Sequence, residues 1–416
     1  MLDIFKKILN YRGVGFFITK EVFSGFHRHN FLAFNASISF FTLFALIPLI
    51  LLIFFFLSQW LANSSFALSH LISLTSHLLP EINIRIMNEV YKVSSTNATW
   101  GFLWIMVLFI AATPLTGSLR TSFANILGLP NKNTFLKNKV KDIFAVITIM
   151  ILFFLYVFLE IELLQASSKF VEYIPIVKKI YFSSITSLVL LILTVMIFFN
   201  FFFPIKIKKK YLLMGAILTS LSWYSLSYLF DFFLNISSFY GTFFGGMRGL
   251  FISLIWLYLN TASLLLGAEL ISALHKKEIL LLKQLFVIKH IHKHPIINDL
   301  MKLFGRRYEK NTLIFKKGDR DQRLYFIIEG EINITQGNRI ITQGNRIETI
   351  GAGNYFGELA LLNKIPFLGR VTDAEVISDW AKIIIVSDTQ MKKILAEDHN
   401  VAMYFLSNMA RKLQLT

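Results

Sequence analysis

The chain has 416 residues, of which 55% are hydrophobic and 16% are charged, and it contains no cysteine. This composition favours a membrane protein of two or three domains, and it excludes disulfides and cysteine–zinc sites. The formal net charge is +17. Because the basic residues gather in segments between apolar runs, the excess charge indicates contact with anionic lipid. We therefore expect the lipid bilayer as a partner and no nucleic acid.

Six apolar runs follow a polar, basic N-terminal segment at residues 1–30. A secretory signal would place its apolar run earlier and end it at a small-residue cleavage site. The runs lie at residues 31–61, 100–116, 143–164, 182–203, 211–233 and 250–273. A helix needs roughly 20 apolar residues to cross the hydrocarbon core. The sequence therefore predicts an α-helical transmembrane bundle of six spans at residues 31–274.

The loops between these runs alternate in charge. Basic loops follow the second, fourth and sixth runs, whereas the other loops mix signs and are nearly neutral. The basic residues are Arg120, Lys132, Lys137, Lys139, Lys141, Lys206, Lys208, Lys209, Lys210, Lys276, Lys277 and Lys283. Since lysine and arginine are enriched on the cytoplasmic side of membrane proteins, the pattern predicts that both termini are cytoplasmic.

Two prolines inside the runs, Pro48 and Pro114, are functional candidates. Each removes a backbone donor within a span and frees a carbonyl group. In transporters such breaks line the substrate path. The alternative is a kink that a neighbouring helix tolerates, because proline is common in membrane helices.

Glu269 is the third candidate in the membrane part, near the inner end of the sixth span. An ionisable residue within a membrane marks a functional site by default. The small residues Gly267 and Ala268 beside it permit close contact between helices. Three further acids fall near the outer ends of their spans, where we interpret them as interfacial: Glu160, Glu162 and Asp231.

Three stretches of the membrane part resemble the YihY/BrkB family of bacterial inner-membrane proteins. Residues 35–49 read NASISFFTLFALIPL, and residues 254–258 and 266–270 read LIWLY and LGAEL. The resemblance, over residues 16–273, implies a six-helix bundle in the inner membrane with both termini inside. The family has carried the label ribonuclease BN. Metal-dependent phosphodiester cleavage needs converging carboxylates, and the acids here are scattered, so we predict no enzyme, no catalytic residue and no metal site.

The pattern changes after the last span. Residues 275–295 form a basic juxtamembrane linker, in which His290 and His294 could share a metal only as a minor alternative. From residue 296 onward, short β-rich runs are separated by turn signals, which predicts an α+β domain at residues 296–416 with an antiparallel β-roll. A tandem duplication at residues 334–347 indicates a lengthened surface hairpin.

Residues 351–362 (GAGNYFGELALL), followed by Arg370, carry the chemistry of this domain. A glycine-rich turn can direct backbone N–H groups toward a phosphate. Arg370 supplies a forked cationic donor, and Glu358 can accept a hydrogen bond from a sugar hydroxyl. The stretch therefore predicts a site for a small sugar phosphate.

Three motifs resemble those of the cyclic nucleotide-binding domain. They are FKKGD at residues 315–319, LYFIIEG at residues 324–330 and GNYFGELALL at residues 353–362. The resemblance, over residues 285–415, implies a β-roll that holds cAMP or cGMP as a regulatory ligand, with no other cofactor. It implies that Glu358 takes the ribose 2′-hydroxyl and that backbone N–H groups of the cassette meet the ligand. The cassette residues carried over are Phe356, Gly357, Glu358, Leu359, Ala360, Arg370, Val371 and Thr372.

The cassette departs from the family pattern after Pro366. The family usually has an arginine directly after this proline, whereas here Arg370 follows only after three other residues. Either a short insertion lengthens the cassette and Arg370 still reaches the phosphate, or the site has lost its anion clamp. Val371 has no hydroxyl group where guanine-selective members often have one, so cAMP is favoured over cGMP.

The sequence as a whole predicts a bacterial inner-membrane transporter or permeability element of unknown substrate, regulated by a cytoplasmic cyclic-nucleotide sensor. One alternative is a non-transporting scaffold or envelope factor with a degenerate sensor. Another is a membrane-bound ribonuclease. The sequence leaves open whether the chain forms a homo-oligomer. No substrate can be inferred from these residues.

Overall fold

The computed structural model describes residues 14–62, 98–129, 135–171, 179–236, 248–287, 296–335, 348–358, 360, 369–397 and 399–414. The chain forms two compact units. We call Glu21–His275 the helical unit, and Met1–Lys20 with Lys276–Thr416 the β-sheet unit. The linker histidines and most of the duplicated segment lie outside the described residues.

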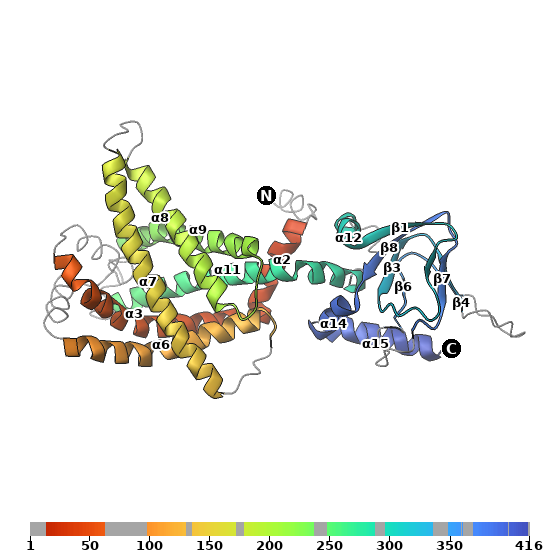
Figure 1. Ribbon diagram of the computed structural model, residues 1–416, viewed down its shortest axis with the longest axis horizontal. Helices are drawn as coiled ribbons and strands as arrows, with labels where there is room; N and C mark the ends of the chain where they lie inside the picture. The colour runs from red at the N-terminus through yellow and green to blue at the C-terminus, as the bar shows by residue number, and fades with distance from the viewer. Residues whose placement is uncertain are drawn as a thin grey trace, which may run out of the picture. The chain divides into compact units, whose positions relative to one another are not determined.

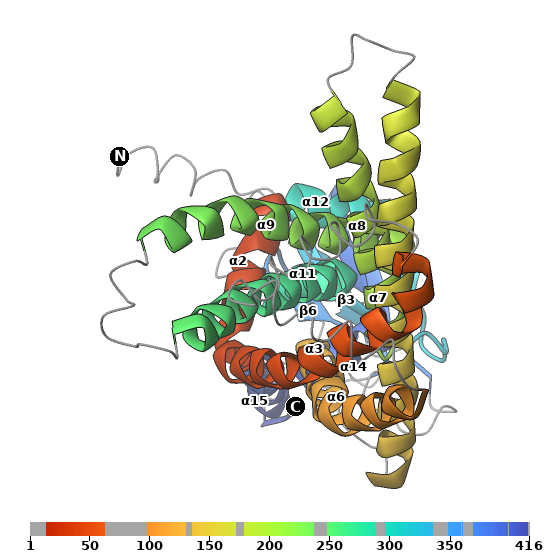
Figure 2. The same cartoon turned by 90° about the vertical axis from the view of Figure 1, so that its left-hand side faces the viewer.

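Long apolar helices make up the helical unit (Figure 1). They are α2 (Val14–Arg28), α3 (Phe31–Ala62), α6 (Ala98–Ile126), α7 (Phe135–Val171), α8 (Lys179–Phe202), α9 (Lys209–Ile236) and α11 (Arg248–Val287), the first and last of which continue into the β-sheet unit. The six predicted spans fall on α3, α6, α7, α8, α9 and α11. Figure 2 shows α3 beside α6 and α7 beside α8.

Among the described residues, four helical stretches are long and apolar enough to cross a membrane. They are Lys139–Leu163, Ile185–Phe202, Lys209–Phe230 and Phe251–Val287. A fifth candidate is the pair Phe17–Arg28 and Phe31–Leu46, which is bent by 73°. Four to five candidate spans are therefore shown, and the count of six stays a prediction.

Aromatic and small residues pack the helical unit. Phe123 of α6 is fully buried and stacks on Phe203 with ring centroids 4.9 Å apart. Gly267 of α11 lies against α9, where a Cβ atom would overlap Thr219 and stand 2.9 Å from the Gly215 carbonyl oxygen. Only glycine allows the two backbones to approach this closely, as expected for helix contacts in membranes.

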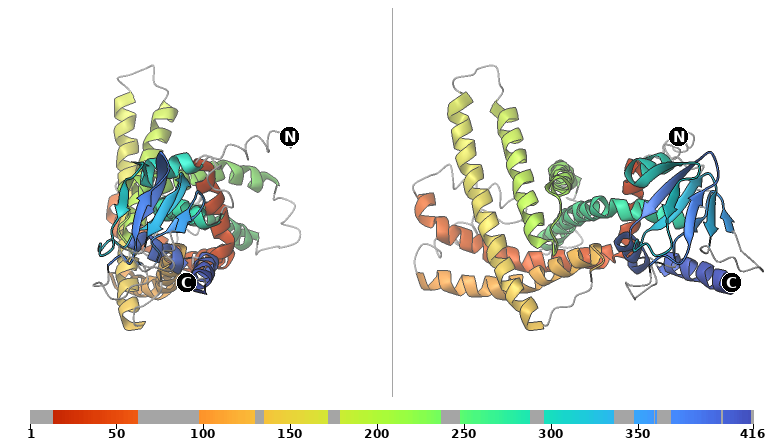
Figure 3. Two further views of the ribbon diagram at one scale, coloured as in Figure 1. Left: turned by 90° about the vertical axis from the view of Figure 1, so that its right-hand side faces the viewer. Right: turned by 45° about the vertical axis from the view of Figure 1, so that its right-hand side comes forward.

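Two antiparallel sheets make up the centre of the β-sheet unit (Figure 3). The strands are β1 (Gly305–Glu309), β2 (Leu313–Phe315), β3 (Leu324–Glu329), β4 (Ile332–Thr335), β5 (Glu348–Ile350), β6 (Tyr355–Phe356), β7 (Asp373–Val376) and β8 (Trp380–Val386). Their orders are β1-β8-β3-β6 and β2-β7-β4-β5. The predicted antiparallel β domain is therefore confirmed, and the pairing of β4 with β5 places the duplication between two hairpin strands.

Strand β3 explains the continuous apolar run LYFII in the sequence. Its side chains alternate between two cores: Tyr325 and Ile327 join the cluster between the sheets, whereas Leu324, Phe326 and Ile328 face the helices. Both sides of the strand are buried, so no polar alternation appears. The covering helices are α12 (Ile296–Phe304), α14 (Asp388–Glu397), α15 (His399–Gln414) and the end of α11.

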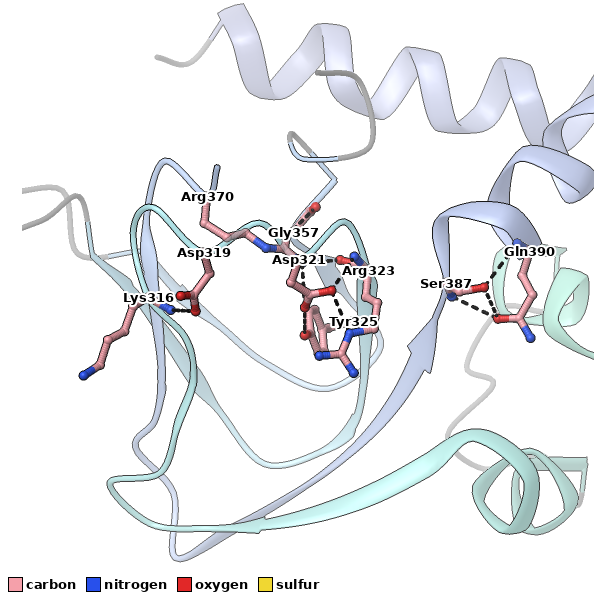
Figure 4. A network of polar contacts seen from close by, with 9 residues as sticks. All are labelled: Lys316, Asp319, Asp321, Arg323, Tyr325, Gly357, Arg370, Ser387 and Gln390. Atoms are coloured by element: carbon pink, nitrogen blue, oxygen red, sulfur yellow. Dashed lines mark hydrogen bonds and ion pairs between the residues drawn. The ribbon is translucent and has the colours of Figure 1, made fainter. Parts of the chain in front are cut away.

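A capping box starts helix α14. The backbone N–H of Gln390 donates to the Ser387 hydroxyl at 3.3 Å, and the backbone N–H of Ser387 donates to Gln390 Oε1 at 2.9 Å. This reciprocal pair satisfies two N–H groups that would otherwise lack partners at the helix start. It fixes the point where the chain leaves β8, and Figure 4 draws both residues.

Candidate functional site

The cassette begins where β6 ends. Phe356 pairs with Tyr325 of β3, and their rings stack with centroids 5.2 Å apart. Gly357 follows with a φ of +85°, a conformation that favours glycine. Glu358 and Ala360 are buried, and Leu359 lies outside the described residues. The β6 pairing therefore fixes the start of the cassette and turns the chain at Gly357.

Arg370 reaches the cassette despite its displacement in sequence. Its Nη1 donates to the Gly357 carbonyl oxygen at 2.9 Å, and its Nη2 donates to the Arg323 carbonyl oxygen at 2.6 Å. The guanidinium carbon lies 4.1 Å from the centre of the Phe315 ring. Figure 4 shows the arginine directed toward Gly357 and Asp321. Arg370 therefore lies at the start of the cassette, and its contact with a phosphate stays a prediction.

Backbone hydrogen bonds of Arg370 and the strand that follows it fix the position of this residue. Its N–H donates to the Asp319 carbonyl oxygen at 2.8 Å, and its carbonyl oxygen accepts from the Gly318 N–H at 2.8 Å. Three residues later β7 begins and pairs with β2. The arginine is therefore placed by this strand pairing rather than by its distance from Pro366.

One donor of Arg370 has no partner among the described residues. The residue is 3% exposed, and its Nε atom is buried without a hydrogen-bond acceptor. Buried polar groups are nearly always paired, so an unpaired N–H here needs an explanation such as a ligand or a water molecule. The free donor lies in the arginine that contacts the cassette, where a phosphate oxygen could accept from it.

Three residues that the sequence analysis did not identify surround this arginine. Asp321 Oδ2 lies 3.4 Å from Arg370 Nη2, accepts from the Tyr325 hydroxyl at 2.5 Å, and its Oδ1 accepts from Arg323 Nε at 2.7 Å. Burial disfavours the Asp321 carboxylate, but the hydrogen bonds from Arg323 and Tyr325 outweigh it and lower the pKa of Asp321. The aspartate thus stays charged and holds the guanidinium in position.

Val371 and Thr372 follow the arginine and directly precede β7. Val371 is 38% exposed and Thr372 is half-buried. An exposed valine next to the buried guanidinium offers an apolar surface and no hydroxyl group to a ligand. These two predicted residues are therefore adjacent to Arg370, and their contact with a ligand stays a prediction.

Replacing Gly357 with alanine should lower the free energy of unfolding of the β-sheet unit by about 1–3 kcal/mol and weaken nucleotide binding. The left-handed φ strains any L side chain, and a Cβ atom would lie 2.6 Å from Arg370 Nη1 and displace it. Thermal unfolding of the full chain, with and without cAMP, measures both effects. Gly351→Ala is the matched control, because a Cβ atom there meets nothing within 4 Å; equal effects of the two changes would contradict the prediction.

The structure describes the surroundings of Pro114 but not those of the Pro48 side chain. Pro48 lies within α3, and its side-chain surroundings lie outside the described residues. Pro114 lies within a continuous α6, where the Thr113 and Thr116 hydroxyls donate to the Phe109 and Thr113 carbonyl oxygens. Hydroxyl groups near a proline commonly satisfy freed carbonyls in membrane helices. The carbonyl that Pro114 leaves without its N–H partner is that of Ile110, to which neither hydroxyl donates, so the functional role of Pro114 stays a prediction.

Glu269 lies in a buried hydrogen-bonded pair with His29. Its Oε1 is 2.7 Å from His29 Nδ1, and the glutamate side chain is 4% exposed. Its carboxyl group also packs against Gly25 of α2, where a Cβ atom would lie 2.6 Å from Oε2. Asn125 of α6 donates to the His29 carbonyl oxygen at 3.1 Å. The pair therefore joins the turn between α2 and α3 to α11.

Two family profiles match the chain. The family described as "Virulence factor BrkB" matches residues 22–284, and the family described as "Cyclic nucleotide-binding domain" matches residues 305–398. The chain thus carries a cyclic nucleotide-binding domain after the helical unit, and the resemblances noted in the sequence are confirmed.

Two curated proteins are similar to separate parts of the chain. The putative ribonuclease-like protein YfkH of Bacillus subtilis is 23% identical over 273 residues, which are 62% of this chain and 95% of that protein. The putative potassium channel protein RPA4233 of Rhodopseudomonas palustris is 22% identical over 121 residues, which are 28% of this chain and 26% of that protein.

Two solved structures are similar to about a third of the chain. A catabolite activator protein of Thermus thermophilus is 23% identical, with 30% of this chain and 58% of that chain covered and a TM-score of 0.25. The regulatory domain of Toxoplasma gondii PKA with cAMP is 17% identical, with 33% and 52% covered and a TM-score of 0.24. The chain therefore spans just over half of each of these structures.

Proposed function

This chain belongs to the BrkB family, and from that premise we propose that it is a bacterial inner-membrane transporter or permeability element regulated by a cytoplasmic cyclic-nucleotide sensor. The family match over residues 22–284 and the apolar helices support the membrane part. The domain match over residues 305–398 supports the sensor. The basic loops support cytoplasmic termini. The transported substrate is left open.

One observation carries the sensor part of the proposal: the buried Arg370 guanidinium lies at the Gly357 carbonyl, and its Nε has no acceptor within the part of the chain that the structure describes. A nucleoside 3′,5′-cyclic monophosphate presents a singly charged phosphate, which suits one forked donor. Glu358 is the acceptor for the ribose 2′-hydroxyl. Because Val371 brings no hydroxyl group for guanine, cAMP is the proposed ligand and cGMP the weaker one.

An aromatic contact connects the proposed sensor to α11, the last membrane helix. Within the β-sheet unit, Phe286 at the end of α11 packs against Tyr355 with ring centroids 6.0 Å apart. Tyr355 stacks in turn on Phe405 of α15 at 5.6 Å. Because Tyr355 lies two residues before Gly357, a change in the cassette on ligand binding moves a side chain that touches both helices. A ligand with different affinities for two such arrangements shifts their populations.

Titration of the full chain in lipid nanodiscs with cAMP, cGMP and 5′-AMP tests the proposal. We expect submillimolar affinity for cAMP, a lower affinity for cGMP and none for 5′-AMP, whose dianionic phosphate has no ring. Ligand should also change hydrogen exchange in α11 and the flux of ions or small solutes through proteoliposomes. Absence of binding at millimolar cAMP would refute the sensor, and binding without any change in flux would favour the scaffold alternative.

The variant Phe286→Ala separates binding from coupling. It should keep the affinity for cAMP within a few-fold but abolish the ligand-dependent change in hydrogen exchange of α11. Val287→Ala is the matched control, because Val287 is adjacent and 54% exposed. Loss of cAMP binding in Phe286→Ala would show instead that the aromatic contact holds the cassette together.

That the chain is not an enzyme stays a prediction. Metal-dependent RNA cleavage by the purified full chain, lost on replacement of one or two carboxylates, would contradict it and favour the ribonuclease alternative.

A further inference from the structure

Glu160 is a buried carboxylic acid of the helical unit that no function discussed so far uses. It lies in α7 and is only 7% exposed, whereas Glu162, two residues later, is exposed. Glu160 is therefore packed within the helical unit and is not exposed as a snorkelling side chain would be. The helix turns by about 100° per residue, so two acids two positions apart face different directions, and packing against α8 selects Glu160.

Only part of the Glu160 carboxyl group has hydrogen-bond partners among the described residues. Tyr156, one helical turn earlier in α7, and Ser187 of α8 hydrogen-bond to the carboxyl group. Its Oε2 atom is buried and has no partner among the described residues. One oxygen of this carboxyl group is therefore unpaired between two helices.

An unpaired carboxylate oxygen in such surroundings is costly. Transfer of a charge out of water costs several kcal/mol even after the protein relaxes, and acids inside membranes are rare for this reason. Uptake of a cation removes the charge. The free Oε2 is the position where that cation would bind.

The small number of oxygen ligands identifies the cation. Metal cations such as Ca²⁺ and Mg²⁺ require about six or more oxygen ligands, whereas the carboxyl group here is joined by one phenol and one hydroxyl group. Among the described residues, no group of three or more His, Cys, Asp or Glu side chains comes together. A proton needs a single oxygen atom, and the site provides it.

The described neighbours bring no opposing charge. Helix α8 has no titratable side chain from Ile185 to Phe202, the segment that packs beside α7. Described residues of α6 have none before Arg120, which pairs with Asp142 at the other end of α7. Among the residues whose side chains the structure describes, the titratable groups around Glu160 are thus Tyr156 and the exposed Glu162, both on its own helix.

We propose that Glu160 is a reversible proton-binding site of the helical unit, in which Tyr156 and Ser187 donate the hydrogen bonds that stabilise the deprotonated form. The site lies at the end of α7 remote from Asp142, and it is independent of nucleotide binding. It provides the membrane part with a group that can take up and release a proton within the bundle.

Labelling with a hydrophobic carbodiimide tests this site, because the reagent modifies protonated carboxylic acids in apolar surroundings. The full chain in lipid nanodiscs is labelled across a pH series, and the modified residue is identified by mass spectrometry. We expect modification of Glu160 that falls as the pH rises and returns on acidification. Glu160→Gln should remove it, and the matched control Glu162→Gln should leave it unchanged.

Replacing either hydrogen-bond donor should shift the pH dependence of the labelling in a defined direction. Removing a hydrogen bond to the charged form, by Tyr156→Phe or Ser187→Ala, should move the labelling curve to higher pH by about one pH unit. Thermal unfolding of each variant shows whether the bundle stays folded. Labelling that is constant at every pH, modification of Glu162 instead, or no labelling of a folded chain would each overturn the proposal.

Discussion

Replacing Arg370 with alanine should lower the affinity of the full chain for cAMP by about 10- to 150-fold. A hydrogen bond from a charged donor to phosphate contributes roughly 1.5–3 kcal/mol, and Arg370 is the cation that lies at the cassette. Because its Nε has no acceptor among the described residues, a phosphate oxygen can bind there without breaking a bond that the structure shows. Isothermal titration of the full chain in nanodiscs measures the loss.

Alanine at this position also removes structural contacts. The Gly357 and Arg323 carbonyl oxygens lose a donor, and the Phe315 ring loses the guanidinium that lies 4.1 Å above it. Arg370→Lys therefore accompanies the alanine variant: it keeps the charge but cannot reach both carbonyls with a planar fork. We expect an affinity between those of the wild type and the alanine variant.

Arg320 offers a matched control for charge. It lies in the same segment between β2 and β3 as Asp321, but its side chain is exposed. Arg320→Ala should change cAMP affinity by no more than a few-fold, since an exposed charge is screened by salt. If Arg320→Ala and Arg370→Ala weakened cAMP binding equally, the loss of affinity would come from the change in net charge. The position of the Arg370 guanidinium at the cassette would then not be its cause.

The strands of the sensor were predictable because local pattern and tertiary structure agree. In LYFIIEG, a run buried on both faces ends at Glu329 and Gly330, and the glycine adopts a φ of +95° that the turn requires. The position of Arg370 was not predictable by counting from Pro366. It depends on backbone hydrogen bonds to Gly318 and Asp319, which are some fifty residues distant in the chain and depend on the pairing of β2 with β7.

Side-chain burial in the helical unit was harder to infer from sequence. An apolar run predicts a helix but has almost no amphipathic period, so it does not show which face of α7 meets α8. The sequence therefore did not distinguish Glu160 from Glu162 in burial, whereas the packing buries only Glu160. Similarly, Glu269 was a candidate by its charge alone, and its partner His29 is 240 residues away in a turn that no periodicity predicts.

Loss of the His29–Glu269 pair should destabilise the helical unit strongly. His29→Ala leaves the Glu269 carboxyl group 4% exposed without its imidazole partner, and breaking a buried pair by removing one member typically costs about 3–5 kcal/mol. Thermal unfolding in detergent should show a much lower Tm.

A neighbouring ion pair provides the comparison. Arg28 pairs with Glu21 along α2, and the Arg28 side chain is 44% exposed, so Arg28→Ala should cost at most about 1 kcal/mol. The double variant His29→Ala with Glu269→Gln should recover part of the stability lost in His29→Ala, because no unpaired charge stays buried. If His29→Ala were as mild as Arg28→Ala, the carboxyl group would be accommodated without the histidine. In that case, the contact between the α2–α3 turn and α11 would depend on the packing of Gly25 against Glu269 rather than on charge.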